Sequence, residues 1–320
     1  MLVLSHADVE ALLPMADCIE AMDAAMRGLA RGEFYQPLRL KARPDGVANR
    51  MAFMPALRMS GRKLWGVKEI VVTPDNAKHA LDPHQGAVVL HDGDNGSLLA
   101  IVNASAITSI RTAAVTALAT RALARPEASS VAILGAGVQA RAHIEALRCV
   151  LPRAQYRIWS RTRDHAEALA RDSQAQVAAS AEAACAGADV VCTVTGAATP
   201  IVKREWFAPG CHINAVGSSV AFARELDGAT MASGTLFVDR RESTVNESGD
   251  YLFAVAEGAI GPDHIAAELG EVLIGKHPGR TANNELTIFK SLGLAVQDLA
   301  AAELVWQRAR ERNVGVEAPW

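Results

Sequence analysis

The chain has 320 residues, of which half are hydrophobic and 21% are charged, and its formal net charge is −3. This length and composition are typical of a globular protein with two domains. The small negative charge argues against a nucleic-acid-binding surface, and no apolar run reaches the ~18 residues that a membrane span requires.

The N-terminal third predicts two helices followed by three strands. Ser5-His6-Ala7-Asp8 has the polar pattern of a helix start, and residues 16–29 form an Ala-rich amphipathic helix that stops near Gly32. Alternating apolar residues predict strands at 65–72, 87–90 and 98–102. The cluster Asp92-Gly93-Asp94-Asn95-Gly96 between the last two strands is a strong signal for a hairpin turn.

The remainder of the chain predicts a doubly wound parallel sheet. Residues 108–124 indicate a helix, which Arg125-Pro126-Glu127 breaks. From residue 131 to about 239 strands and helices alternate, with later strands at 189–194, 212–216 and 235–238. Residues 288–312 predict one long helix beyond the sheet. The fold class is therefore α/β, a Rossmann-type sheet domain inserted into a second, α+β domain.

A glycine-rich turn supplies the most informative motif of the chain. The apolar run 131–134 reads as a buried strand, and Gly135-Ala136-Gly137-Val138-Gln139-Ala140 follows it at the start of a helix over 141–151. In the G-x-G-x-x-G/A pattern the first glycine makes the tight turn and the second admits a pyrophosphate. Ala140 takes the third, closely packed position. We expect a dinucleotide here, held at the helix N-terminus.

The loop after the next strand indicates which dinucleotide is bound. Residues 155–159 read as that strand, and a carboxylate that grips a ribose 2′-hydroxyl would follow it in an NAD site. The chain instead has Ser160-Arg161-Thr162-Arg163. Guanidinium groups bind phosphate through two parallel hydrogen bonds, so residues 160–163, the arginine loop, suit a 2′-phosphate. The sequence favours NADPH, with NADH as the alternative.

The cysteines and the first residues indicate a cytoplasmic protein. The five cysteines are an odd number without Cys-x-x-Cys spacing, which indicates buried thiols in a reducing compartment. The opening Met1-Leu2-Val3-Leu4-Ser5-His6 lacks the basic start and long apolar core of a signal peptide.

Several short motifs occur along the chain in a fixed order: Gly66-Val67-Lys68, Ile107-Thr108-Ser109-Ile110-Arg111-Thr112-Ala113-Ala114, Gly135-Ala136-Gly137-Val138-Gln139-Ala140, Asn214-Ala215-Val216-Gly217, Asp239, Glu247-Ser248-Gly249-Asp250, Gly279-Arg280-Thr281 and Gly293-Leu294-Ala295-Val296-Gln297-Asp298. Taken together, these motifs resemble the ornithine cyclodeaminase/μ-crystallin family over essentially the whole chain. The resemblance implies a homodimer, with a substrate-binding and dimerisation domain at 1–122 plus 293–320 and a Rossmann domain at 123–292. Beyond the glycine-rich turn and the arginine loop, we expect Thr112, Thr195, Val216, Gly217 and Ser218 to bind the cofactor.

Four residues outside the nucleotide fold are candidates for substrate chemistry. In the family the arginine and lysine that match Arg111 and Lys68 hold the carboxylate of an amino or imino acid, and a guanidinium binds a carboxylate in a fixed plane. Arg39 is a further candidate for carboxylate binding, or a surface charge. A proton donor is also needed; Lys68 is one candidate, and His84 in Asp82-Pro83-His84-Gln85-Gly86 is another unless it only caps a turn.

One departure from the family pattern bears on the reaction. Ornithine cyclodeaminases carry a carboxylate shortly after the Val-Gly turn, and Ser219 occupies the aligned position here. A serine cannot neutralise a substrate ammonium, and an unpaired buried charge is costly. Glu225 or Asp227 could compensate from a shifted loop. Ser219 then remains a substrate-binding candidate for an imino acid.

These observations favour an NAD(P)H-dependent ketimine reductase that converts Δ1-pyrroline-2-carboxylate to L-proline. The alternatives are an ornithine cyclodeaminase, an alanine dehydrogenase-like enzyme and a non-catalytic NADPH-binding protein of crystallin type. We expect no metal site, because the carboxylates Asp239, Glu247 and Asp250 have no histidines in ligand spacing and suit turn and capping roles.

Overall fold

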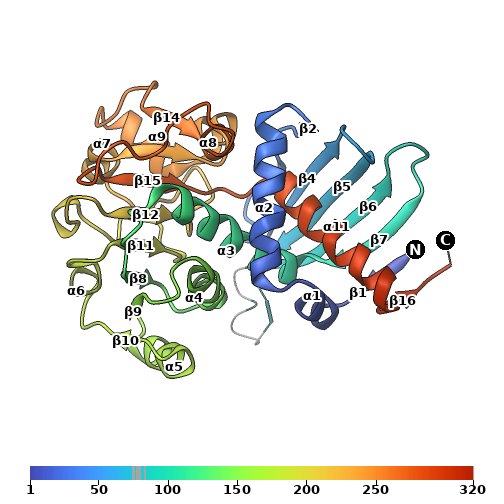
Figure 1. The fold of residues 1–320 in the computed structure, drawn as a ribbon, viewed down its shortest axis with the longest axis horizontal. Helices are drawn as coiled ribbons and strands as arrows, with labels where there is room; N and C mark the ends of the chain where they lie inside the picture. Colours follow the sequence, from blue (N-terminus) through green and yellow to red (C-terminus); the bar gives the residue numbers. More distant parts are fainter. Residues whose placement is uncertain (74–75, 77–80, 83, 320) are drawn as a thin grey trace. The chain divides into compact units, whose positions relative to one another are not determined.

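Two β-sheets organise the chain, one in each of its two compact units (Figure 1). The computed structural model describes residues 1–73, 76, 81–82 and 84–319. The first unit comprises Met1–Thr112 with Leu294–Trp320, and the second comprises Ala113–Gly293. The first of these boundaries lies ten residues before the one expected from the sequence, inside a single continuous helix.

The sheet of the first unit is mixed and mostly antiparallel. Its order is β16-β1-β7-β6-β5-β4-β2, with β3 also paired to β4, and only β1 and β7 run parallel among the described strands. The hairpin turn at residues 92–97 joins β6 to β7 as predicted. The strands are β1 (Leu2–Leu4), β2 (Phe34–Tyr35), β3 (Leu40–Ala42), β4 (Arg50–Arg58), β5 (Leu64–Val72), β6 (His84–Asp92), β7 (Leu98–Asn103) and β16 (Val316–Glu317).

Helices cover one face of this sheet. α1 (His6–Leu12) begins at the capping residue Ser5, α2 (Met15–Ala30) packs on α11 (Ala295–Arg312), and α11 crosses β4 to β7 (Figure 1). Gly66 of β5 permits the close approach of α11, because a Cβ there would lie 2.6 Å from Leu299 Cδ1. None of the described helices combines the length and apolarity that crossing a bilayer requires.

The second unit contains the predicted doubly wound parallel sheet. Its order is β10-β9-β8-β11-β12-β15-β13-β14, so the strand order reverses between β8 and β11, where such sheets bind nucleotides. All its described pairings are parallel. The strands are β8 (Ser130–Leu134), β9 (Gln155–Trp159), β10 (Gln176–Val177), β11 (Val190–Thr193), β12 (His212–Ala215), β13 (Thr235–Val238), β14 (Ile265–Glu268) and β15 (Thr287–Lys290). The α/β prediction is confirmed.

Apolar side chains fill both faces of this sheet. Successive residues of β8 alternate between two core clusters, with Val131 and Ile133 in one and Ala132 and Leu134 in the other. A strand that is buried on both faces reads as a continuous apolar run, which is why the sequence revealed it.

The helices are α3 (Ala104–Leu123), α4 (Val138–Val150), α5 (Arg163–Ser173), α6 (Ala181–Cys185), α7 (Gly228–Ser233), α8 (Arg241–Glu247), α9 (Gly249–Ala256) and α10 (Leu269–Leu273), with a 3₁₀ turn at Arg204–Trp206.

The prediction of one long helix over residues 288–312 is wrong at its start. Thr287–Lys290 is the strand β15, paired with β12 and β13, and the helix begins only at Ala295. A fully buried parallel strand shows no alternation, so by periodicity it cannot be distinguished from a buried helix segment. The neighbouring strands, which lie far away in sequence, decide the structure of this segment.

Two buried histidines predict acid-sensitive stability. His143 and His212 are fully buried, and burial lowers their pKa values to about 4 and about 3, the charge of Arg280 adding to the effect on His212. Both stay neutral in the folded state while the unfolded chain binds protons below pH ~6.5. Stability is thus intact above that pH and lost as the pH falls further. Between pH 7.5 and 5.5 the free energy of unfolding should decrease by about 2–3 kcal/mol from these two groups.

Urea unfolding at a series of pH values measures this loss. The double replacement His143→Gln, His212→Asn should flatten the profile, whereas His6→Gln, at an exposed histidine, should leave it unchanged. An identical slope in the double variant and the wild type would assign the acid sensitivity to other groups.

Candidate active site

Three charged side chains form a buried cluster in the first unit. Lys68 of β5 places its Nζ atom 2.8 Å from Asp298 Oδ2 and 2.9 Å from Oδ1, and Arg111 of α3 donates from Nε to Oδ1 at 2.9 Å. Lys68 is 2% exposed, Arg111 4% and Asp298 1%. Strand alternation points Lys68 toward α11, where the first turn carries Asp298. The structure therefore brings together the lysine and the arginine that the sequence singled out.

The cluster carries an excess of positive charge. Two cations share the single carboxylate of Asp298, and their other polar contacts with described residues are neutral, Gln297 Oε1 at 3.0 Å from Arg111 Nη1 and Thr108 Oγ1 at 3.4 Å from Lys68 Nζ. A buried charge without a counter-charge is costly. A ligand carboxylate would neutralise it, so the arrangement suits the binding of a small acid.

The electrostatics of the cluster also suit proton transfer. Burial lowers the pKa of Lys68 to about 8, the positive charges of Arg111 and Arg39 lower it further, and Asp298 opposes them. Burial alone would raise the pKa of Asp298, but Arg111 and Lys68 bring it below its ordinary value. Near neutral pH, Asp298 is thus a fixed anion, while Lys68 carries a proton that it can release.

The other two candidates of the first unit contribute to the same electrostatic environment. Arg39 is partly buried and immediately precedes β3. His84 is the first residue of β6; burial lowers its pKa, Asp82 opposes this, and Lys68, Arg50 and Arg111 lower it further. Its backbone N–H donates to Asp82 Oδ1 at 2.7 Å. Pro83, the neighbouring residue of the predicted loop, lies outside the described residues.

The sequence alone does not indicate a role for Asp298. It belongs to a motif that carried the family resemblance, at the start of the last helix, so a signal was present. Its partners lie 187 and 230 residues away along the chain, and only the folded structure shows that one carboxylate binds both cations. Thr112 is buried next to Arg111 on α3.

In the second unit, the glycine-rich turn opens a cleft of about 420 Å³. Gly135 has φ +127°, which favours glycine, and a Cβ there would lie 2.7 Å from Val194 O. Gly137 is the N-cap of α4 with open space beside it, and no side chain caps the helix, so its first N–H groups suit a phosphate. The cleft is lined by Gly135, Ala136, Gly137, Trp159, Ser160, Arg161, Thr162, His165, Val194, Thr195, Gly196, Ala197 and Ile201.

This lining includes much of the cofactor site expected from the sequence and adds several residues. Ser160, Arg161, Thr162 and Thr195 are present, and none of the described residues that line the cleft is acidic. The residues that the sequence did not indicate include His165, in the first turn of α5, and Trp159, Val194, Gly196, Ala197 and Ile201.

The other expected cofactor residues lie elsewhere. Arg163 does not line the cleft, because its Nε donates to Glu167 Oε1 at 2.7 Å on the surface of α5. Val138, Gln139 and Ala140 form the first turn of α4, with Ala140 fully buried against the sheet. Nor do Val216, Gly217 and Ser218, at the end of β12, line the cleft; the N–H groups of Val216 and Gly217 both donate to Thr193 O.

Glu225 and Asp227, the two carboxylates that could have replaced the acid missing at Ser219, are both hydrogen-bonded within the protein. Glu225 accepts hydrogen bonds from Thr193, Thr195 and the Gly217 N–H, and it has 0% exposed surface. Asp227 caps α7 by accepting from Thr230 N at 2.8 Å. Ser219 itself is partly buried. The segment therefore presents no spare carboxylate for a substrate ammonium.

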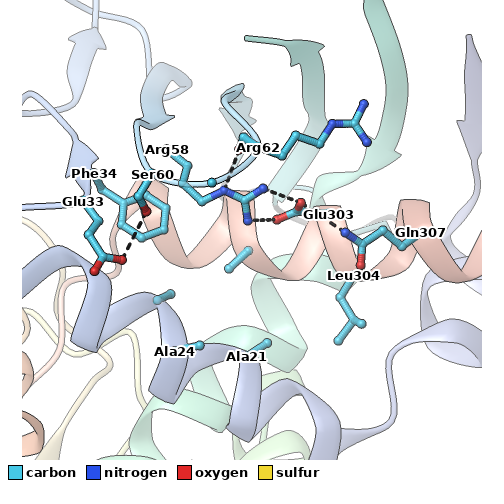
Figure 2. Close-up of a pocket in the computed structure, with 13 residues that line it drawn as sticks. Ala21, Ala24, Glu33, Phe34, Arg58, Ser60, Arg62, Glu303, Leu304 and Gln307 are labelled. Carbon is cyan, nitrogen blue, oxygen red and sulfur yellow. Dashed lines mark hydrogen bonds and ion pairs between the residues drawn. The ribbon is translucent and has the colours of Figure 1, made fainter.

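A second cavity of about 550 Å³ lies in the first unit between α2, α11 and the β4–β5 turn (Figure 2). Its charged groups already have partners: Arg58 binds Glu303 through two hydrogen bonds of 2.6 and 2.7 Å, and Glu33 accepts from Ser60 Oγ. Figure 2 shows the alanines of α2 forming the opposite wall. Nothing in this cavity requires a ligand, and we assign it no chemistry. In the described part of the chain, no three metal-ligating side chains are placed to hold an ion.

Comparison with known proteins identifies the family. The model of the ornithine cyclodeaminase/mu-crystallin family matches residues 1–313. The mouse ketimine reductase mu-crystallin is 40% identical over 293 residues, 90% of each chain. The structure of the Thermococcus litoralis Delta(1)-pyrroline-2-carboxylate reductase in complex with NADH and L-proline superposes with a TM-score of 0.95, 34% identity and coverage of 99% and 100% of the two chains. An archaeal alanine dehydrogenase dimer with bound NAD superposes with a TM-score of 0.94, 31% identity and coverage of 100% and 99%. The chain belongs to the ornithine cyclodeaminase/mu-crystallin family.

Proposed function

We propose that the protein is an NAD(P)H-dependent ketimine reductase that converts Δ1-pyrroline-2-carboxylate to L-proline. The observation that carries the proposal is the unbalanced positive charge of the cluster formed by Lys68, Arg111 and Asp298, which a substrate carboxylate would neutralise. Two of the relatives described above are named as reductases of this kind, and the Thermococcus structure contains proline, the product of the proposed reaction.

The residues of the chain would bind the imino acid and supply the proton that its ring nitrogen gains. Arg111 holds the carboxylate in a plane, and Asp298 keeps Arg111 and Lys68 in place. A nicotinamide dinucleotide, for which the cleft of the second unit is suited, supplies a hydride when bound. The imine carbon gains that hydride and the ring nitrogen gains a proton, for which Lys68, with a pKa of about 8, is the proposed donor and His84 the alternative.

The same geometry disfavours cyclodeamination of ornithine. A diamine brings a second ammonium, and Ser219 offers it no charge while Glu225 and Asp227 are engaged within the protein. An ammonium added next to two buried cations would be costly. The reduction of a cyclic imine needs no such carboxylate.

We propose NADPH as the preferred cofactor, because Arg161 lines the cleft and no described acidic residue does. Arg161→Ala should weaken NADPH binding by about tenfold or more, the loss of a charge-assisted hydrogen bond, and leave NADH binding nearly unchanged. Isothermal titration with each cofactor measures the two Kd values. Arg163→Ala is the matched control: its arginine binds Glu167, so both affinities should be unaffected. Equal weakening of NADPH and NADH would contradict a 2′-phosphate role.

We propose that the protein is a homodimer that pairs through the face of the first unit's sheet opposite α11. Helix α11 covers the face that carries Lys68. The strand registers place exposed apolar side chains together on the other face: Val3, Leu40, Trp65, Val71 and Val316. Exposed apolar patches mark interaction sites, and the archaeal relative is described as a dimer.

Trp65→Glu should therefore convert a dimer into a monomer. A carboxylate buried at an apolar interface carries a large desolvation penalty. Light scattering after size exclusion should give twice the chain mass for the wild type and the chain mass for the variant. Val245→Glu, at a similarly exposed valine of α8, should remain dimeric. A wild-type monomer would refute the proposed pairing.

We also propose a reducing compartment such as the cytoplasm. The five cysteines Cys18, Cys149, Cys185, Cys192 and Cys211 are free thiols in the structure, which supports this placement.

The deciding experiment measures NADPH consumption with freshly generated Δ1-pyrroline-2-carboxylate. Parallel reactions contain NADH with the imine, ornithine with an ammonia assay, and pyruvate plus ammonia. Rapid NADPH oxidation with formation of proline supports the reductase. Ammonia release from ornithine would establish the cyclodeaminase, and net reduction of pyruvate an alanine dehydrogenase. Tight NADPH binding without any turnover would indicate a non-catalytic binding protein.

A further inference from the structure

Three ionisable side chains lie fully buried at the carboxyl edge of the parallel sheet. Lys290 ends β15, Asp250 lies in the first turn of α9, and Glu225 belongs to the segment between β12 and α7. Each has 0% exposed surface. Buried charges are costly unless paired, and they concentrate where a protein performs its chemistry.

Lys290 and Asp250 anchor the segment that follows β12. Lys290 Nζ lies 2.8 Å from Asp250 Oδ2 and donates to Ser218 O at 2.5 Å. Asp250 Oδ1 accepts the backbone N–H groups of Glu225 at 2.8 Å and Leu226 at 2.9 Å. The ion pair thus holds this segment at two points along the chain.

The carboxylate of Glu225 then binds the ends of two central strands. Its Oε1 atom accepts from the N–H and the hydroxyl of Thr195, both at 2.7 Å, and its Oε2 atom accepts from Thr193 Oγ1 at 2.7 Å and Gly217 N at 2.8 Å. An N–H group can only donate, and each oxygen receives one, a pattern that suits an ionised carboxylate. Burial raises the pKa of Glu225, and its hydrogen bonds to Thr195 and the charge of Lys290 oppose that rise.

The two strand ends belong to the second half of the nucleotide fold. β11 and β12 follow the reversal of strand order, and Thr195 lines the cleft. In a doubly wound sheet each half binds one mononucleotide, and the glycine-rich turn with its arginine loop takes the adenosine half. The segments that Glu225 holds are therefore on the nicotinamide side.

We propose that Lys290, Asp250 and Glu225 are positioning residues that fix the backbone at Thr195 and Gly217 for the nicotinamide half of the cofactor. This inference rests on the cofactor role proposed for the cleft. A misplacement of about 1 Å at a reacting centre costs on the order of 100-fold in rate. Fixing the backbone at this edge of the sheet therefore affects kcat more than it affects the overall affinity for the cofactor.

Glu225→Gln and Asp250→Asn test the network at constant side-chain size. The Gln amide would turn a donor toward either Gly217 N–H or the Thr195 donors. We expect kcat for imine reduction to fall by about 10–100-fold, with KM for the imine nearly unchanged. We expect Kd for NADPH to weaken by about fivefold, the effect of one lost hydrogen bond, while Kd for 2′-phospho-ADP-ribose, which lacks nicotinamide, stays at its wild-type value.

Asp189→Asn is the matched control. Asp189 also accepts two backbone N–H groups, those of Ser129 and Ser130, but at the opposite ends of the strands. This variant should lower the melting temperature and leave both Kd values and kcat unchanged. If the single variants do not fold, Lys290→Met with Asp250→Asn removes both charges and avoids a lone buried ion.

The possible results distinguish a failure of the positioning role of Lys290, Asp250 and Glu225 from a failure of the proposed function. Wild-type kcat and NADPH affinity in Glu225→Gln and Asp250→Asn would overturn the inference, as would equal weakening of NADPH and 2′-phospho-ADP-ribose, which indicates a general structural role. A wild-type protein that binds neither NADPH nor NADH would overturn the proposed function, and this inference with it.

Discussion

Lys68→Met is expected to lower kcat for ketimine reduction by about 10²–10⁴-fold, the range that a positioned acid or base contributes. Lys68 is buried beside Arg111 and Asp298, and its pKa of about 8 keeps its proton transferable near neutral pH. Methionine preserves the length of the side chain, so the decrease in kcat measures the contribution of the charge and the proton of Lys68. The affinity for NADPH should be unchanged, because the residues that line the cleft belong to the second unit.

The pH profile of the wild type supplies an independent measurement. If Lys68 is the proton donor, kcat/KM should fall as the pH rises above about 8, where Lys68 loses its proton, and this limb should be absent in Lys68→Met. The control is Lys63→Met, at an exposed lysine that precedes the same strand. Loss of NADPH binding in Lys68→Met would instead mean that the substrate site is wrongly placed. An unaltered kcat would mean that His84, and not Lys68, is the proton donor.

Asp298→Asn is expected to lower the free energy of unfolding by about 3–5 kcal/mol, the cost of removing one partner from a buried ion pair. The replacement leaves Lys68 and Arg111 buried together without a carboxylate. Urea unfolding measures the loss. Because a small carboxylate would supply the missing charge, adding acetate or L-proline should restore more stability to this variant than to the wild type.

Glu303→Gln provides the comparison on the same helix. Glu303 binds Arg58 through two hydrogen bonds at the edge of the cavity in Figure 2; Glu303 is buried, but the side chain of Arg58 is 24% exposed. Glutamine keeps one acceptor for Arg58, whose side chain still reaches solvent, so the replacement should cost about 1.5–3 kcal/mol, the contribution of a hydrogen bond to a charged group, and leave kcat unchanged. Equal losses in the two variants would mean that Asp298 stabilises the fold no more than the carboxylate of an ordinary two-residue ion pair does.

The cofactor cleft was the more predictable of the two candidate sites. Its glycine-rich turn and arginine loop are continuous segments of sequence that directly follow β8 and β9, and parallel strands bring their carboxyl ends to one edge. The placement of Arg163 was not predictable, because its ion pair with Glu167 depends on where α5 begins. A shift of one residue in the start of a helix turns a side chain from the cleft to the surface, and the composition of the loop does not specify that shift.

The sequence by itself determined the parallel α/β sheet, the dinucleotide turn and the absence of an acid at the 2′-position loop, because each depends on neighbouring residues and on short-range backbone preferences. Only the tertiary structure decided that Asp298 binds both Lys68 and Arg111, that Thr287–Lys290 is a strand, and that Glu225 is engaged beneath the cleft. The physical reason is distance along the chain. Charge pairing and strand pairing join residues that lie tens to hundreds of positions apart, and no local pattern records which partners the fold will bring together.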